Sequence, residues 1–171
     1  MKLNQHFKTL YILLIIGQLA LCNYCQFGPY VMLSMLPAMI LCLPTGMSTI
    51  TGMIVAFCTG MSVDWLSEGL IGLNTAAIVP VALMRKGIIR TFLGEDIIIR
   101  GDRFSYRKNG FAKISAANSI CLIVFLGLYI LFDGAGTLPA AFCFTKGGVS
   151  FVCNFVLAII VTNLLTPEDK K

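Results

Sequence analysis

The chain has 171 residues, of which 57% are hydrophobic and only 12% are charged, and its formal net charge is +5. A soluble domain normally carries about 25% charged residues, so the composition excludes an ordinary soluble fold. It also excludes a disordered chain, which needs low hydrophobicity and high net charge. We therefore expect residues 1–171 to form a single domain within a lipid bilayer.

Six apolar stretches are each long enough to be a membrane-spanning helix, which needs about 20 mostly apolar residues. They are continuous rather than alternating, and only helices and closed barrels satisfy their backbone in lipid. The predicted fold class is all-α, a polytopic membrane protein with six transmembrane helices. The second stretch contains Pro29 and Pro37, which predict a kink. The six predicted spans are residues 7–24, 27–43, 47–66, 69–84, 114–132 and 149–165.

The basic residues predict the orientation, because Lys and Arg are enriched in cytoplasmic loops. With the N-terminus inside the cell, all 13 basic residues except Lys146 are cytoplasmic, and both termini lie on that side. Residues 86–113 are then a basic cytoplasmic loop. For this loop we favour topology and contact with anionic lipid over binding of nucleic acid.

The third predicted span carries small or polar residues at every fourth position, which places them on one helix face. Small residues at this spacing let a neighbouring helix approach closely in a membrane. We expect this face to pack against another helix of the chain or of a partner, and we expect its acidic member to be buried or at an interface. The five residues are Ser48, Gly52, Ala56, Gly60 and Asp64.

The fourth predicted span opens with a second small-residue contact, provided by Gly69 and Gly72. Asn74 follows inside the apolar zone, where a polar side chain should hydrogen-bond across to another helix. Asp64, or the backbone near Ser67, is the nearest partner for it. Arg85 marks the cytoplasmic exit of this span. We include Gly72, Asn74 and Arg85 with the residues expected at a helix-packing or partner interface.

Residues that could support catalysis or hold a metal are scarce. We expect no Ser/His/Asp set, since the single histidine is at position 6. No GxxxxGK[ST] or HExxH motif is present. Cys22 and Cys25 have CxxC spacing but lack the second ligand pair of a zinc site. We therefore predict that the protein is not an enzyme and that it has no catalytic residues, no metal and no cofactor.

Residues 60–67 and 72–77, closed by Met84 and Arg85, resemble the rod-shape-determining protein MreD family. The shared features are a Gly-x-x-x-Asp pair in the third helix, a Gly-x-Asn/His-small-Ala opening of the fourth, and an Arg at its cytoplasmic end. The length and the six spans match over essentially the whole chain, and the sharp similarity covers residues 44–85.

This resemblance implies a non-catalytic scaffold in the bacterial inner membrane that helps maintain cell shape. Proteins of this family are thought to bind MreC and to couple the MreB cytoskeleton to peptidoglycan synthesis by RodA and its transpeptidase. Carried over by position, the motif residues are Gly60, Asp64, Gly72, Asn74 and Arg85. The family has no catalytic residues to transfer.

An alternative is the substrate-binding component of an energy-coupling-factor vitamin transporter, which has a similar size and architecture. Such a component needs polar and aromatic groups around one cavity near the outer face. The predicted outer loops contain several such residues, and this alternative therefore stays open. They are Asn23, Tyr24, Gln26, Tyr30, Trp65, Glu68 and Asp133.

Overall fold

The computed structural model of the chain describes residues 5–25, 28–67, 70–95, 97, 110–134 and 138–166. In these ranges the secondary structure is helical and includes no strand. The termini lie outside them, as do residues 96 and 98–109 of the predicted 86–113 loop, and so do Gln26, Glu68 and Gly69. The helices are α1 (Gln5–Tyr24), α2 (Leu36–Leu41), α3 (Thr49–Leu66), α4 (Leu73–Leu93), α7 (Phe111–Gly134) and α8 (Ala140–Leu165).

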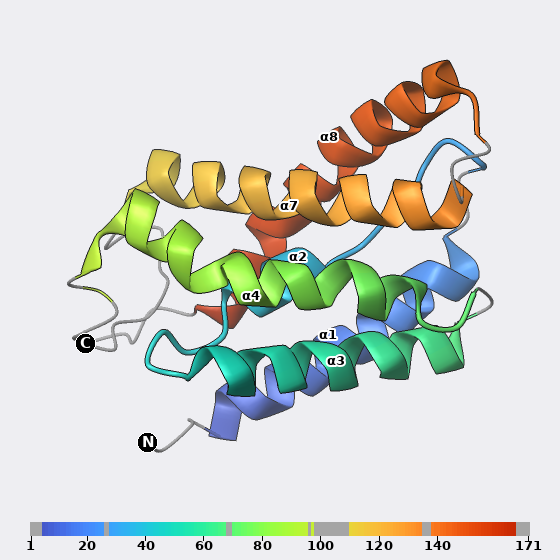
Figure 1. Cartoon of the computed structure of the whole chain (residues 1–171). Helices are drawn as coiled ribbons and strands as arrows, with labels where there is room; N and C mark the ends of the chain where they lie inside the picture. Colours follow the sequence, from blue (N-terminus) through green and yellow to red (C-terminus); the bar gives the residue numbers. More distant parts are fainter. Residues whose placement is uncertain are drawn as a thin grey trace.

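The long helices form a bundle around the short helix α2 (Figure 1). Helix α4 lies between α3 and α7 and packs closely against both, while α8 crosses α7 and α1 packs against α3. All six residues of α2 are buried. The core of the bundle therefore forms where α2 meets α4, α7 and α8.

Four helices in the described part of the chain are long and apolar enough to cross a membrane: Phe7–Tyr24, Thr49–Leu66, Phe111–Gly134 and Ala140–Leu165. Many of their large apolar side chains point outward, such as Ile50 on α3 and Phe144 on α8. Outward apolar faces are typical of helices in contact with lipid. An all-helical protein suited to a membrane is confirmed.

The prediction of a helix over residues 27–43 is wrong for most of that stretch. Residues 28–35 are not helical, and only α2, Leu36–Leu41, is. The two prolines favour a helix that begins at Leu36 and not earlier, since Pro29 has no backbone N–H to donate and a proline such as Pro37 interrupts a helix except in its first turn. Pro37 is accepted because it lies in the first turn of α2, where its missing N–H has no helical partner to lose.

The predicted 86–113 loop begins too early, because α4 continues to Leu93 instead of ending at Met84. Basic side chains mark a membrane boundary but do not end a helix. Gly94 ends α4, with a φ of 90° that favours glycine. The segment 98–109 lies outside the described residues.

The last two predicted spans are also too short. Helix α7 covers Phe111–Gly134, against a prediction of 114–132. Helix α8 begins at Ala140, directly after Pro139, whereas the predicted span began at Val149. The prediction excluded Lys146, but this lysine is paired with Asp133 and lies inside α8.

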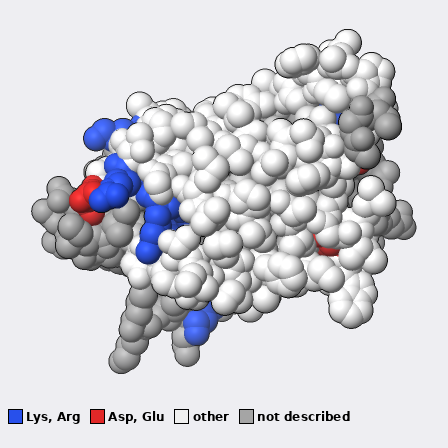
Figure 2. Space-filling view, viewed as in Figure 1, with Lys and Arg blue, Asp and Glu red and all other residues white. Residues whose placement is uncertain are grey.

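Most of the Lys and Arg side chains visible in Figure 2 gather at one end of the molecule, while the face of the helices in that view is largely uncharged. This basic end is where α4 ends and α7 begins, and it carries Lys86, Arg90 and Lys113. Lys146 lies near the opposite end, which we call the far end, where α7 ends and α8 begins.

Candidate functional site

Asp64, at the end of α3, holds the beginning of α4. Its Oδ1 accepts hydrogen bonds from the backbone N of Asn74 at 2.9 Å and from Asn74 Nδ2 at 3.0 Å. Its Oδ2 accepts from the backbone N of Thr75 at 2.9 Å and from Thr75 Oγ1 at 2.6 Å. The predicted hydrogen bond between Asn74 and Asp64 is confirmed. The carboxylate is 2% exposed, and the helix N-terminus stabilises its charge.

Gly60 lies where α3 and α4 approach most closely. A Cβ added to Gly60 would be 2.7 Å from Thr75 Cα, which is backbone and cannot rotate away. Gly52 and Ala56 are buried on the same face of α3, but a Cβ on Gly52 would meet no atom within 4 Å. Of these positions, only Gly60 requires glycine for close packing.

Two further residues of the predicted packing face and span opening, Ser48 and Gly72, are the N-caps of their helices. Ser48 is exposed and is the N-cap of α3, where its side chain accepts from the backbone N of Thr51 at 3.1 Å. Gly72 is the N-cap of α4 with a φ of 94°, a conformation that side chains rarely adopt. Gly72 therefore permits the turn that brings Asn74 and Thr75 to Asp64.

Arg85 turns into the core of the bundle. It is 3% exposed, and its Nε donates to the carbonyl of Leu41 at 3.2 Å while Nη2 donates to the carbonyl of Leu43. These carbonyls lie at the C-terminal end of α2, where the helix dipole is negative. Arg85 therefore joins α4 to α2 as Asp64 joins α3 to α4.

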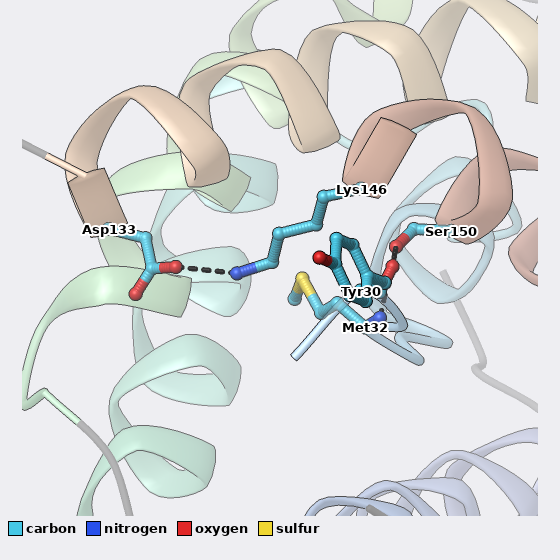
Figure 3. Close-up of polar contacts among 5 residues, drawn as sticks. All are labelled: Tyr30, Met32, Asp133, Lys146 and Ser150. Atoms are coloured by element: carbon cyan, nitrogen blue, oxygen red, sulfur yellow. Dashed lines mark hydrogen bonds and ion pairs between the residues drawn. The ribbon is translucent and has the colours of Figure 1, made fainter. Parts of the chain in front are cut away.

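A second polar cluster, which the sequence reasoning missed, supports the non-helical residues 28–35. Asn154 of α8 accepts from the backbone N of Ser34 at 2.6 Å and donates to the carbonyl of Met32 at 2.7 Å. Ser150 accepts from the backbone N of Met32 at 2.9 Å (Figure 3). From α1, Gln18 accepts from the backbone N of Met35 at 2.6 Å. We call Gln18, Ser150 and Asn154 the amide clamp.

The amide clamp explains how irregular backbone is accepted within an apolar bundle. Its three side chains are 0% exposed, and backbone outside a helix is tolerated at membrane depth only where protein groups satisfy it. Gln18 and Asn154 are both visible as polar residues inside apolar stretches. The partners of Ser150 and Asn154 could not be predicted, because they are 118 to 122 residues away in the chain.

A cavity of about 510 Å³ opens at the far end, between the end of α1, residues 28–33, the beginning of α4 and the facing parts of α7 and α8. Much of its lining is apolar. We call it the far-end cavity, and its polar or aromatic side chains include Cys22, Cys25, Asp64, Asn74, Tyr129 and Lys146.

Figure 3 shows Lys146 reaching from α8 toward Asp133 at the end of α7. Its Nζ donates to Asp133 Oδ2 at 2.6 Å and lies 6.0 Å from the centroids of the Tyr129 and Phe142 rings. Of the outer-loop residues predicted to surround a cavity, Tyr24 and Trp65 are 88% and 76% exposed. They do not line this one.

All seven cysteines are free thiols. Among the described residues, no three His, Cys, Asp or Glu side chains come together as a metal site requires. Comparison with models of known families, with curated proteins and with solved structures finds no match to the chain.

Proposed function

We propose that the chain is a non-catalytic membrane scaffold of the bacterial rod complex, similar to the MreD family, in the inner membrane. The observation that carries the proposal is the position of the motif residues. Gly60, Asp64, Asn74 and Arg85 are buried in contacts between helices of this chain. Residues that lock helices together suit a protein whose activity is to present a fixed surface to partners.

The proposal includes six membrane passes with both termini in the cytoplasm. Besides the four long apolar helices, α4 and residues 28–43 would be the remaining passes. In support, Ser34 contacts Asn154 and Cys42 contacts Thr162, so this segment runs along α8 in step with it. The basic end would then face the cytoplasm and anionic lipid.

The groove between α7 and α8 is the surface where we propose that a transmembrane helix of a partner packs. Its volume is about 590 Å³, and its lining includes Gly127, Gly147, Gly148 and Phe144. Helices associate in membranes through such small residues. A Cβ on Gly127 would meet no atom within 4 Å, so the floor is open to a neighbour. An MreC-like protein, or RodA with its transpeptidase, would supply that helix, with MreB contacted indirectly.

The test is crosslinking in native membranes, followed by purification in detergent and mass spectrometry. We compare the wild-type chain with Gly127→Leu, which fills the groove, and with Gly87→Leu, a control on α4 that also has open space. An MreC-like coiled-coil protein with RodA should be recovered with wild type and with Gly87→Leu, and several-fold less with Gly127→Leu.

Two outcomes would contradict the proposal. Recovery of a pair of transport ATPases in place of the rod proteins would mean that the chain is the substrate-binding component of a transporter. If Gly127→Leu recovers as much of the rod proteins as wild type does, the groove between α7 and α8 is not the partner surface, although the chain would still be a scaffold.

A further inference from the structure

The charges that line the far-end cavity are balanced. Asp64 contributes one negative charge and Lys146 one positive charge, and they come from different helices, α3 and α8. Lys146 is paired with Asp133, so the lining has an anionic end at Asp64 and a donor end at Lys146. A ligand with one charge of each sign matches this lining.

Asn74, which lines this cavity, has an acceptor without a partner. It is 7% exposed, and its Nδ2 donates to Asp64 Oδ1 at 3.0 Å. The carboxylate accepts only, so the amide nitrogen must face it and the amide oxygen must point elsewhere. That oxygen, Oδ1, is buried and has no hydrogen-bond partner among the described residues. Since an unsatisfied buried acceptor is costly, a donor is missing at this point, and the nearby carboxylate favours a cationic one.

Lys146 presents the complementary donors. An ammonium group has three N–H bonds, and the one described partner of Nζ is Asp133, at 2.6 Å. The side chains of Lys146 and Asp133 are 12% and 29% exposed. The Tyr129 and Phe142 rings flank the Nζ atom and hold it at the cavity. Its remaining N–H bonds can donate to an oxyanion.

We propose that the far-end cavity binds a zwitterionic group with a primary ammonium and an oxyanion on one short chain, as in phosphoethanolamine. The ammonium donates to Asn74 Oδ1 beside Asp64, and the oxyanion accepts from Lys146. Leu70 and Leu73, which also line the cavity, contact the apolar remainder. The same chemistry occurs in a lipid headgroup and in a free small molecule.

Two cysteines of the wild-type chain provide the measurement. Cys25 lines the far-end cavity, whereas Cys143 lines the separate groove between α7 and α8, and both are partly exposed. We place the full chain in phosphatidylcholine nanodiscs and follow alkylation at each cysteine by peptide mass spectrometry. The first arm titrates O-phosphorylethanolamine, and the second includes phosphatidylethanolamine in the nanodisc.

Protection of Cys25, with Cys143 unchanged, is the expected result in at least one arm. Protection by the soluble probe identifies a free ligand, and protection by the lipid alone identifies a headgroup. O-phosphorylcholine has no ammonium N–H and is expected to bind about tenfold more weakly, because it leaves Asn74 Oδ1 unpaired. Unchanged alkylation of Cys25 in both arms, or equal protection by O-phosphorylcholine, would overturn the proposal.

Two variants separate ligand binding from a structural role. Lys146→Gln is expected to weaken binding about tenfold, because a charge-assisted hydrogen bond is lost. Asp133→Asn is expected to strengthen it several-fold, because Lys146 is released from a competing anion. If the ion pair were only structural, both variants would change the protection of Cys25 in the same direction. That result would contradict the proposal even if both variants fold well.

Discussion

Two regions of this molecule bury polar groups in an apolar bundle, and they do so by opposite means. In the α3–α4 hairpin, Asp64 satisfies the beginning of α4 only 10 and 11 residues further along the chain. In the amide clamp, Asn154 satisfies Met32 and Ser34 across 120 residues or more. The hairpin is a local device built on a helix end, whereas the clamp exists only once the bundle has assembled.

The contrast bears on where each region is vulnerable. In the hairpin, the carboxylate of Asp64 alone accepts four hydrogen bonds. The close approach of the two helices depends on one glycine, Gly60, which faces the backbone of Thr75. The clamp distributes its hydrogen bonds over three side chains from two helices. Single substitutions should therefore cost more in the hairpin than in the clamp.

Asp64→Ala should have the largest effect and lower the free energy of unfolding by about 4 kcal/mol, because it leaves buried N–H groups without an acceptor. The measurement is equilibrium unfolding in mixed micelles. Asp133→Asn is the matched control, since this partly exposed ion pair should be worth less than about 1 kcal/mol. If both variants lower the free energy of unfolding equally, the buried hydrogen bonds of Asp64 stabilise the protein no more than the partly exposed ion pair does.

Gly60→Ala should cost about 2 kcal/mol, because its Cβ would clash with the Thr75 backbone and force α3 and α4 apart. Gly52→Ala, on the same face of α3 with open space above it, should have almost no effect. The melting temperatures of the two variants provide the comparison. If both melt like wild type, close approach of the helices does not stabilise the hairpin.

Asn154→Leu should cost about 2 kcal/mol or slightly less, because two hydrogen bonds to residues 32–34 are lost and their backbone stays buried. Asn163→Leu, at an exposed position of the same helix, is the control. Hydrogen exchange at the amide of Ser34 should accelerate in the first variant and not in the second. A loss larger than that of Asp64→Ala would reverse the order of the two regions.

Arg85→Lys should have the smallest effect, about 1 kcal/mol. An ammonium group cannot reproduce the planar guanidinium that reaches the carbonyls of Leu41 and Leu43 together. Arg90→Lys, on an exposed side chain of α4, is the control for unfolding in the same micelles. If Arg85→Lys is as stable as wild type, a single donor is enough to hold the end of α2.

The sequence was most informative where the partners are close in the chain. The spacing of Gly60 and Asp64 and the polar Asn74 in an apolar stretch led to the Asp64–Asn74 hydrogen bond, because short connections place consecutive helices side by side. Arg85 was predicted to mark a cytoplasmic exit and to lie at an interface, but its contact with the end of α2 was not predicted. Basic residues usually mark a membrane boundary. The residues around Arg85 in the sequence do not indicate that its side chain lies beside the C-terminal end of α2.

By itself, the sequence determined that the chain is helical and suited to a membrane, because apolar residues in long continuous runs leave the backbone few alternatives in lipid. It also indicated that Asn74 at the beginning of α4 hydrogen-bonds to Asp64 at the end of α3. Only the tertiary structure decided that residues 28–35 are not helical, that Gln18, Ser150 and Asn154 support them, and that Lys146 and Asn74 line one cavity. The physical reason is that these groups satisfy one another across the bundle, so their partners are defined by packing and not by position in the chain.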